Sequence, residues 1–98
     1  MIPPSQPIRL RSIARWMQDS DRKVKKLPPE ALQSRVMEMD DLMIEAFEDR
    51  EDVLKAQMMK DKTWGTEQGL TQFPLDRMML WQEVVAEFLP TSDQSQEG

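Results

Sequence analysis

The sequence predicts an all-α protein, a three-helix arrangement with one long central amphipathic helix and a disordered C-terminal tail. Three observations predict this class. Apolar residues recur at intervals of three, four and seven in three segments, which is the period of an α-helix. The seven prolines stand near the boundaries of these segments. The longest segment contains no glycine or proline and is rich in strong helix formers.

The first helix is expected over residues 8–26, after an extended lead over residues 1–7. Three prolines keep the lead extended, and Pro7 can occupy the first turn of the helix. Its apolar stripe consists of Leu10, Ile13, Met17 and Val24. Asp19-Ser20-Asp21 offers an alternative, in which this segment caps a second short helix. Because Pro28 disfavours a helical conformation at the preceding residue, the segment ends there.

The second helix is expected over residues 30–62 and carries the clearest pattern. With 100° per residue, its apolar residues fall within an arc of about 160°; they are Leu32, Val36, Met39, Leu42, Met43, Ala46, Phe47, Val53, Leu54 and Met58. Thr63-Trp64-Gly65 ends this helix, with Gly65 as the left-handed residue that follows it. The alternative is a break near residues 49–52, where the chain folds back into a compact four-helix arrangement.

The third helix is expected over residues 74–89, within one helical domain that covers residues 8–89. If Thr71 is its N-cap instead, Leu70 and Leu75 form a hydrophobic staple. Residues 66–73 are expected to be a connection, held in place by Trp64, Leu70 and Phe73. The apolar arc of this helix exceeds about 200°, so it requires cover on more than one side. Residues 90–98 are expected to be a disordered polar tail.

Composition narrows the function classes. The chain has no histidine, cysteine or tyrosine, so it lacks the commonest general base near neutral pH and any thiolate ligand for zinc. An enzyme that uses only carboxylates and lysines is a remote alternative, and we expect no enzyme, cofactor, metal or small-molecule substrate. No apolar run reaches the roughly 18 residues needed to cross a bilayer, and the N-terminus lacks the regions of a secretory signal. We therefore expect a cytoplasmic protein without membrane contact.

Charge is segregated along the chain. Residues 1–28 hold seven basic and two acidic residues, a net charge of +5, so the rest of the chain carries −10. Four basic residues share one face of the first helix: Arg11, Arg15, Arg22 and Lys26. This face can track nucleic-acid phosphates, lie in solvent, or face an acidic protein surface in the same molecule or a neighbouring one. Because an acidic body repels nucleic acid, the protein-facing interpretation is favoured.

Six carboxylates lie opposite the apolar arc of the second helix: Glu38, Asp41, Glu45, Glu48, Asp49 and Asp52. Carboxylate metal sites in helical bundles add histidines that project inward, which this chain lacks. The row is therefore expected to be a solvated or partner-facing surface. Arg50 projects into the centre of the apolar arc, where a buried lone charge is costly. We expect it to pair with a carboxylate or to extend past its apolar neighbours into water.

Helix lengths predict a protein partner. At 1.5 Å per residue, the second helix is roughly 50 Å long and the other two are roughly 25 Å each. Each short helix therefore covers about half of the long one, and the third helix stays partly uncovered. Exposed apolar patches of this size mark association, and nine methionines are typical of either core or adaptable binding surfaces. The expected contact residues are Met39, Met43, Phe47, Leu54, Met58, Met78, Trp81 and Phe88.

These observations favour a non-enzymatic protein-interaction module, namely an adaptor, assembly factor or inhibitor. Its partner is a second copy of the chain, which gives a homodimer through the second helix, or a different protein. A nucleic-acid-associated regulator that uses the basic face is the alternative. Small size, acidic charge and helical composition are also typical of accessory proteins of phages and plasmids, an expectation from composition alone.

Overall fold

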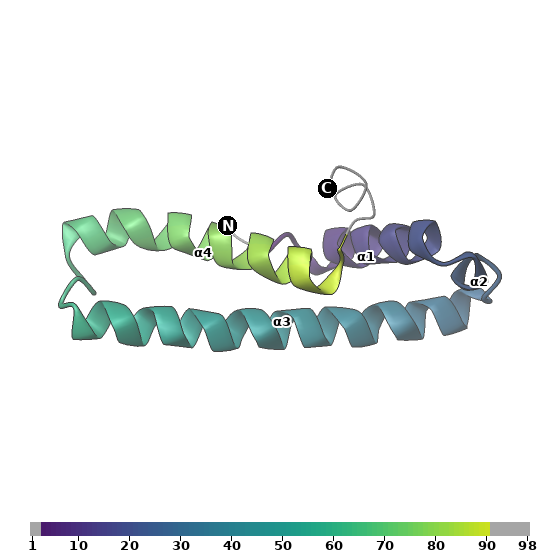
Figure 1. The fold of residues 1–98 in the computed structure, drawn as a ribbon, viewed down its shortest axis with the longest axis horizontal. Helices are drawn as coiled ribbons and strands as arrows, with labels where there is room; N and C mark the ends of the chain where they lie inside the picture. The colour runs from purple at the N-terminus through teal and green to yellow at the C-terminus, as the bar shows by residue number, and fades with distance from the viewer. Residues whose placement is uncertain (1–2, 91–98) are drawn as a thin grey trace.

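The computed structural model describes residues 3–90, which form four helices and no strand. In chain order these are α1 (Gln6–Ser20), α2 (Arg22–Lys25), α3 (Pro29–Lys60) and α4 (Glu67–Phe88). Helix α3 forms one layer along the length of the molecule, and α1 and α4 lie nearly end to end against it in a second layer (Figure 1). The all-α class and the long central helix are confirmed. The expected tail lies outside the described residues from position 91 onward.

The first predicted helix is divided into α1 and α2. Asp21 has an extended backbone conformation (φ −137°, ψ 115°), and its carboxylate accepts a hydrogen bond of 2.9 Å from the backbone N–H of Lys23. This is an N-cap, which satisfies a free donor at the start of α2. The prediction of one continuous helix over residues 8–26 is therefore wrong. The alternative, in which this segment caps a second short helix, is confirmed.

Helix α3 is a single rod of 32 residues. Pro29 occupies its first turn, where the missing N–H costs nothing, and Glu30 adds a negative charge near the positive end of the helix dipole. The helix continues without interruption through residues 49–52. The chain therefore does not fold back there, and the compact four-helix alternative is wrong.

The connection between α3 and α4 is shorter than predicted, and α4 begins at Glu67 rather than near Pro74. Thr66 is the N-cap, because its hydroxyl accepts a hydrogen bond of 3.0 Å from the N–H of Gly69. The alternative N-cap, Thr71, lies inside the helix and donates to the carbonyl of Glu67 at 3.0 Å. The predicted staple requires Thr71 as the N-cap and is therefore absent; Leu70 and Leu75 both lie inside α4 and are 68% and 52% exposed.

The turn between the two helices depends on two unusual backbone positions. Lys62, directly after the C-cap Asp61, has φ +62°, so it takes the left-handed position predicted for Gly65. Gly65 also has positive φ, +83°, but it lies farther along the turn. Gly69 is buried, and a Cβ atom there would lie 2.0 Å from the carbonyl oxygen of Thr63. Glycine at position 69 therefore allows the first turn of α4 to approach the turn closely.

The hydrophobic core lies where α1 and α4 both meet α3. Its buried members are Ile13, Val36, Met43, Phe47, Val84 and Leu89. The predicted stripe of the first helix packs here through Leu10, Ile13 and Met17. Away from this junction, α4 pairs with the C-terminal half of α3 as a hairpin, while α1 lies over the other half of α3 (Figure 1).

Candidate interaction surface

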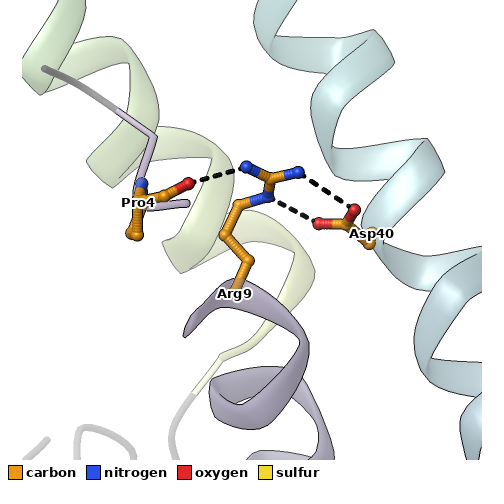
Figure 2. A network of polar contacts seen from close by, with 3 residues as sticks. All are labelled: Pro4, Arg9 and Asp40. Carbon is orange, nitrogen blue, oxygen red and sulfur yellow. Dashed lines mark hydrogen bonds and ion pairs between the residues drawn. The ribbon is translucent and has the colours of Figure 1, made fainter. Parts of the chain in front are cut away.

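A buried ion pair joins α1 to α3 and was missed in the sequence. The Arg9 guanidinium donates to both carboxylate oxygens of Asp40, at 2.7 and 3.1 Å, and to the carbonyl oxygen of Pro4 at 2.6 Å (Figure 2). The side chain of Asp40 is 3% exposed and that of Arg9 is 14% exposed. A signal existed, because Asp40 has the same angular position on α3 as the apolar residue Met58. This contact orients α1 and the segment before it.

The Arg50 side chain pairs with Glu87 of α4. The sequence placed Arg50 in the apolar arc and left two outcomes open, and the structure shows the paired one. The pair is partly exposed, since Arg50 retains 29% and Glu87 60% of side-chain exposure. The pair connects α3 to α4, and because it is partly exposed it adds little to stability.

Aromatic side chains and one arginine connect the core to the far end of the hairpin. The Arg77 guanidinium lies 5.8 Å from the ring centre of Phe47 and 5.5 Å from that of Phe73, and it pairs with Glu51. Phe73 also packs edge-to-face against Trp64, with ring centres 5.2 Å apart. These contacts lie where α3 and α4 face each other. They do not cover the sides of the two helices that face away from this contact.

The eight predicted contact residues fall into three groups. Met43, Phe47 and Met58 are buried in the protein's own interior, at 1%, 3% and 7% exposure. Half-buried positions are occupied by Met39, Leu54, Trp81 and Phe88. Met78 is 46% exposed. Met39, Trp81 and Phe88 also pack against the core, so most of the predicted contact residues stabilise the fold and Met78 is the exposed one.

The predicted basic face is exposed but lies on more than one element. Arg11 and Arg15 belong to α1, Arg22 opens α2, and Lys26 follows it. The six carboxylates predicted opposite the apolar arc are all exposed as well. Among residues 3–90, no ion pair joins the two sets. The basic face therefore does not dock on the acidic row within one molecule.

Exposed apolar side chains concentrate at one end of the molecule. Within residues 3–90, seven of the ten large hydrophobic residues that are exposed lie between residues 53 and 79, a region we call the distal hairpin: Val53, Met59, Trp64, Leu70, Leu75, Met78 and Met79. Val53 retains 70% exposure although it belongs to the predicted apolar arc. The expectation that the short helices leave apolar surface uncovered is confirmed for the single chain. This region has two helices and no third layer (Figure 1).

A surface groove runs between α3 and α4 along one side of the hairpin. Its larger part has a volume of about 650 Å³ and an apolar lining of Val53, Leu54 and Leu80. A smaller part of about 250 Å³ continues toward the turn and shares Leu54 and Gln57 with the first. We call both parts together the α3–α4 groove. The sequence identified Leu54, but it did not identify Leu80, because the wide apolar arc of α4 gave no criterion for which edge would face solvent.

The α3–α4 groove has an acidic lining. Its carboxylates are Asp49 and Glu83 in the larger part and Asp61 and Asp76 in the smaller part. None of these four forms an ion pair within the described part of the chain. The one cationic residue of the lining, Arg50, is already paired with Glu87, outside the lining. The groove therefore combines an apolar surface with uncompensated negative charge.

Other kinds of site were searched for between residues 3 and 90. No helix in that range combines the length and hydropathy that a transmembrane segment needs. In the same range, no cluster of three or more carboxylate, histidine or cysteine side chains is placed to hold a metal ion. Comparison with protein-family models, with curated proteins and with solved structures finds no match for this chain. Functional inference therefore depends on the geometry of the chain itself.

Proposed function

We propose that this protein is a non-enzymatic interaction module that binds another protein chain through the distal hairpin. One observation carries the proposal: seven large apolar side chains are exposed there together, within 27 residues of sequence. Single exposed apolar residues are normal on a protein surface, whereas their concentration in one region favours an association site there. A bound partner covers these side chains and forms a third layer that packs on α3 and α4.

The architecture gives a physical reason for this exposure. A helix that is apolar over more than half of its circumference requires cover on two sides, and α4 is covered by α3 on one side of the distal hairpin. The contacts of the Arg77 guanidinium with Phe47 and Phe73, together with the Arg50–Glu87 pair, link α4 to α3. The uncovered surface is therefore presented on a preorganised scaffold, which lowers the entropic cost of association.

The test compares co-purification of proteins with the wild-type chain and with Val53→Asp/Met79→Asp, in the organism that encodes the chain. Both residues are exposed, at 70% and 60%, so the fold is expected to persist. The matched control is Met37→Asp/Leu42→Asp, which changes two exposed apolar residues in the N-terminal half of α3. The proposal expects bound protein to be lost with Val53→Asp/Met79→Asp and kept with the control. Equal recovery with all three chains contradicts it.

A second candidate function is supported by the basic residues of α1 and α2. Arg11, Arg15 and Arg22 are exposed, and within residues 3–90 they form no ion pair. Such residues can contact phosphates of a nucleic acid. This function expects oligonucleotide binding that weakens steeply with added salt and is abolished in Arg15→Glu. Absence of binding at low salt rules it out.

A further inference from the structure

The α3–α4 groove has the dimensions of a helix-binding site. Its lining extends from Asp49 to Asp61 along α3, which corresponds to about 18 Å at 1.5 Å per residue. That length accommodates about three turns of a docked helix. The apolar part of the lining, Val53, Leu54 and Leu80, lies between the two helices. An amphipathic helix can bury apolar side chains from successive turns against such a surface.

The charge of the groove selects the partner. Four carboxylates line it, and the single cation of the lining is already neutralised by Glu87. Among the described side chains, Asp61 and Asp76 accept hydrogen bonds from the neighbouring glutamines Gln57 and Gln72 alone, at 3.1 and 3.0 Å. These neutral donors leave the net negative charge in place. A partner with lysines or arginines beside its apolar stripe complements this surface.

We propose that the α3–α4 groove binds a cationic amphipathic helix of a different protein, about three turns long, through an apolar stripe flanked by lysine or arginine. This inference rests on the proposed function and names the partner chemistry for it. The basic flanks lie against Asp49 and Glu83 on opposite sides of the groove, and the apolar stripe lies against Val53 and Leu80.

A second copy of the chain fits this groove less well. A two-fold symmetric contact places the same patch on both sides, so the four carboxylates of one copy would face those of the other. Helix α1 of a second copy is basic, but its apolar residues Leu10, Ile13 and Met17 are packed in its own core. It therefore has no free apolar stripe to insert. The symmetric contact therefore lacks complementary charge, and the docking of α1 lacks an apolar stripe for the groove.

The experiment titrates the full chain into fluorescently labelled peptides of 14 residues. The basic peptide has leucines at helical spacing and lysines on both flanks. A second peptide has glutamates in place of the lysines, and a third has the composition of the first with its helical spacing scrambled. We expect the basic amphipathic peptide to bind at least tenfold more tightly than either of the others, with an affinity that falls as salt is added.

Charge reversal in the groove identifies the site. In Asp49→Lys/Glu83→Lys, the basic peptide is expected to bind at least tenfold more weakly and the acidic peptide more tightly than to the wild type. The control, Glu38→Lys/Asp41→Lys, makes the same change of net charge at two exposed positions outside the groove. It is expected to alter binding of the basic peptide less than threefold.

The outcomes separate this inference from the proposed function. Equal binding of basic and acidic peptides, or equal losses in the groove variant and its control, overturns the cationic specificity. A failure of all three peptides to bind overturns it as well. A dimer in light scattering that becomes monomeric in Val53→Asp assigns the groove to a second copy and also overturns it. In each of these cases, loss of protein co-purification in Val53→Asp/Met79→Asp still supports the proposed function.

Discussion

Removing the Arg9 guanidinium is expected to destabilise the fold more than any exposed substitution. In Arg9→Met, the Asp40 carboxylate keeps its place at 3% exposure but loses both of its charged hydrogen bonds. Breaking a buried ion pair in this way costs about 3–5 kcal/mol. Arg9 itself is 14% exposed, so water can partly replace it, and we expect a value near the lower end, about 3 kcal/mol.

The assay is urea unfolding followed by circular dichroism of the helices. With an m-value of about 1.5 kcal/mol/M, a loss of about 3 kcal/mol lowers the unfolding midpoint by about 2 M. A chain of this size has a total stability of about 5–15 kcal/mol, so the transition remains measurable. The control Arg9→Lys keeps the charge but not the two-point contact, and an intermediate loss is expected.

The double variant Arg9→Met/Asp40→Leu separates charge from packing. Replacing both members of a buried pair by apolar residues of similar size is often neutral or stabilising. We therefore expect the double variant to regain most of the stability that Arg9→Met loses. A loss below about 0.5 kcal/mol in Arg9→Met, within the range of ordinary surface substitutions, refutes the reasoning. So does a double variant as unstable as the single one.

Three further substitutions test the backbone features of the hairpin and of α2. Gly69→Ala places a Cβ atom 2.0 Å from the carbonyl oxygen of Thr63, and overpacking of this kind is expected to cost about 1–3 kcal/mol in thermal unfolding; an unchanged melting temperature contradicts this. Asp21→Ala removes the N-cap of α2 and is expected to lower the free energy of unfolding by about 1 kcal/mol. Amide hydrogen exchange at residues 22–25 is expected to become faster. Unchanged exchange there shows that the cap is dispensable. Pro74→Ala restores a backbone N–H inside α4 that can donate to the carbonyl of Leu70. It is expected to raise the free energy of unfolding by about 1 kcal/mol or more. A decrease shows that α4 does not run through position 74 as a regular helix.

The sequence was sufficient to predict the elements whose signals are local and repeated. Helix α3 has a sustained amphipathic pattern without a breaker, and it was predicted within two residues of its observed ends. The break between α1 and α2 was recognised as an alternative, because Asp21 is a good capping residue. In both cases, the determining interactions lie within a few residues of each other in the chain.

The start of α4 was mispredicted because one local rule was outweighed by another local signal. Proline disfavours a helical interior, so the sequence predicts a helix start near Pro74. The Thr66 cap and the close approach of Gly69 to the turn begin the helix earlier. Both contacts join residues no more than six positions apart, so the signal for this helix start was local but was weighed below the rule for proline.

The candidate surface was only partly predictable. Angular position on a helix shows which residues form its apolar face. It does not show which edge of that face a neighbouring helix covers. Phe47 and Val53 belong to the same predicted arc, yet they are 3% and 70% exposed. The Arg9–Asp40 pair joins residues 31 positions apart. The angular position of Asp40 indicates burial, but no pattern in the sequence identifies Arg9 as its partner.

The most direct test of the distal hairpin as a binding surface is photo-crosslinking in living cells of the organism that encodes the chain. A photoreactive phenylalanine analogue is placed at Val53, and in a control chain at Ser34, which is exposed in the N-terminal half of α3. Binding through the distal hairpin predicts discrete crosslinked products of higher mass at Val53 and none at Ser34. No product at Val53, or the same products at both positions, contradicts it.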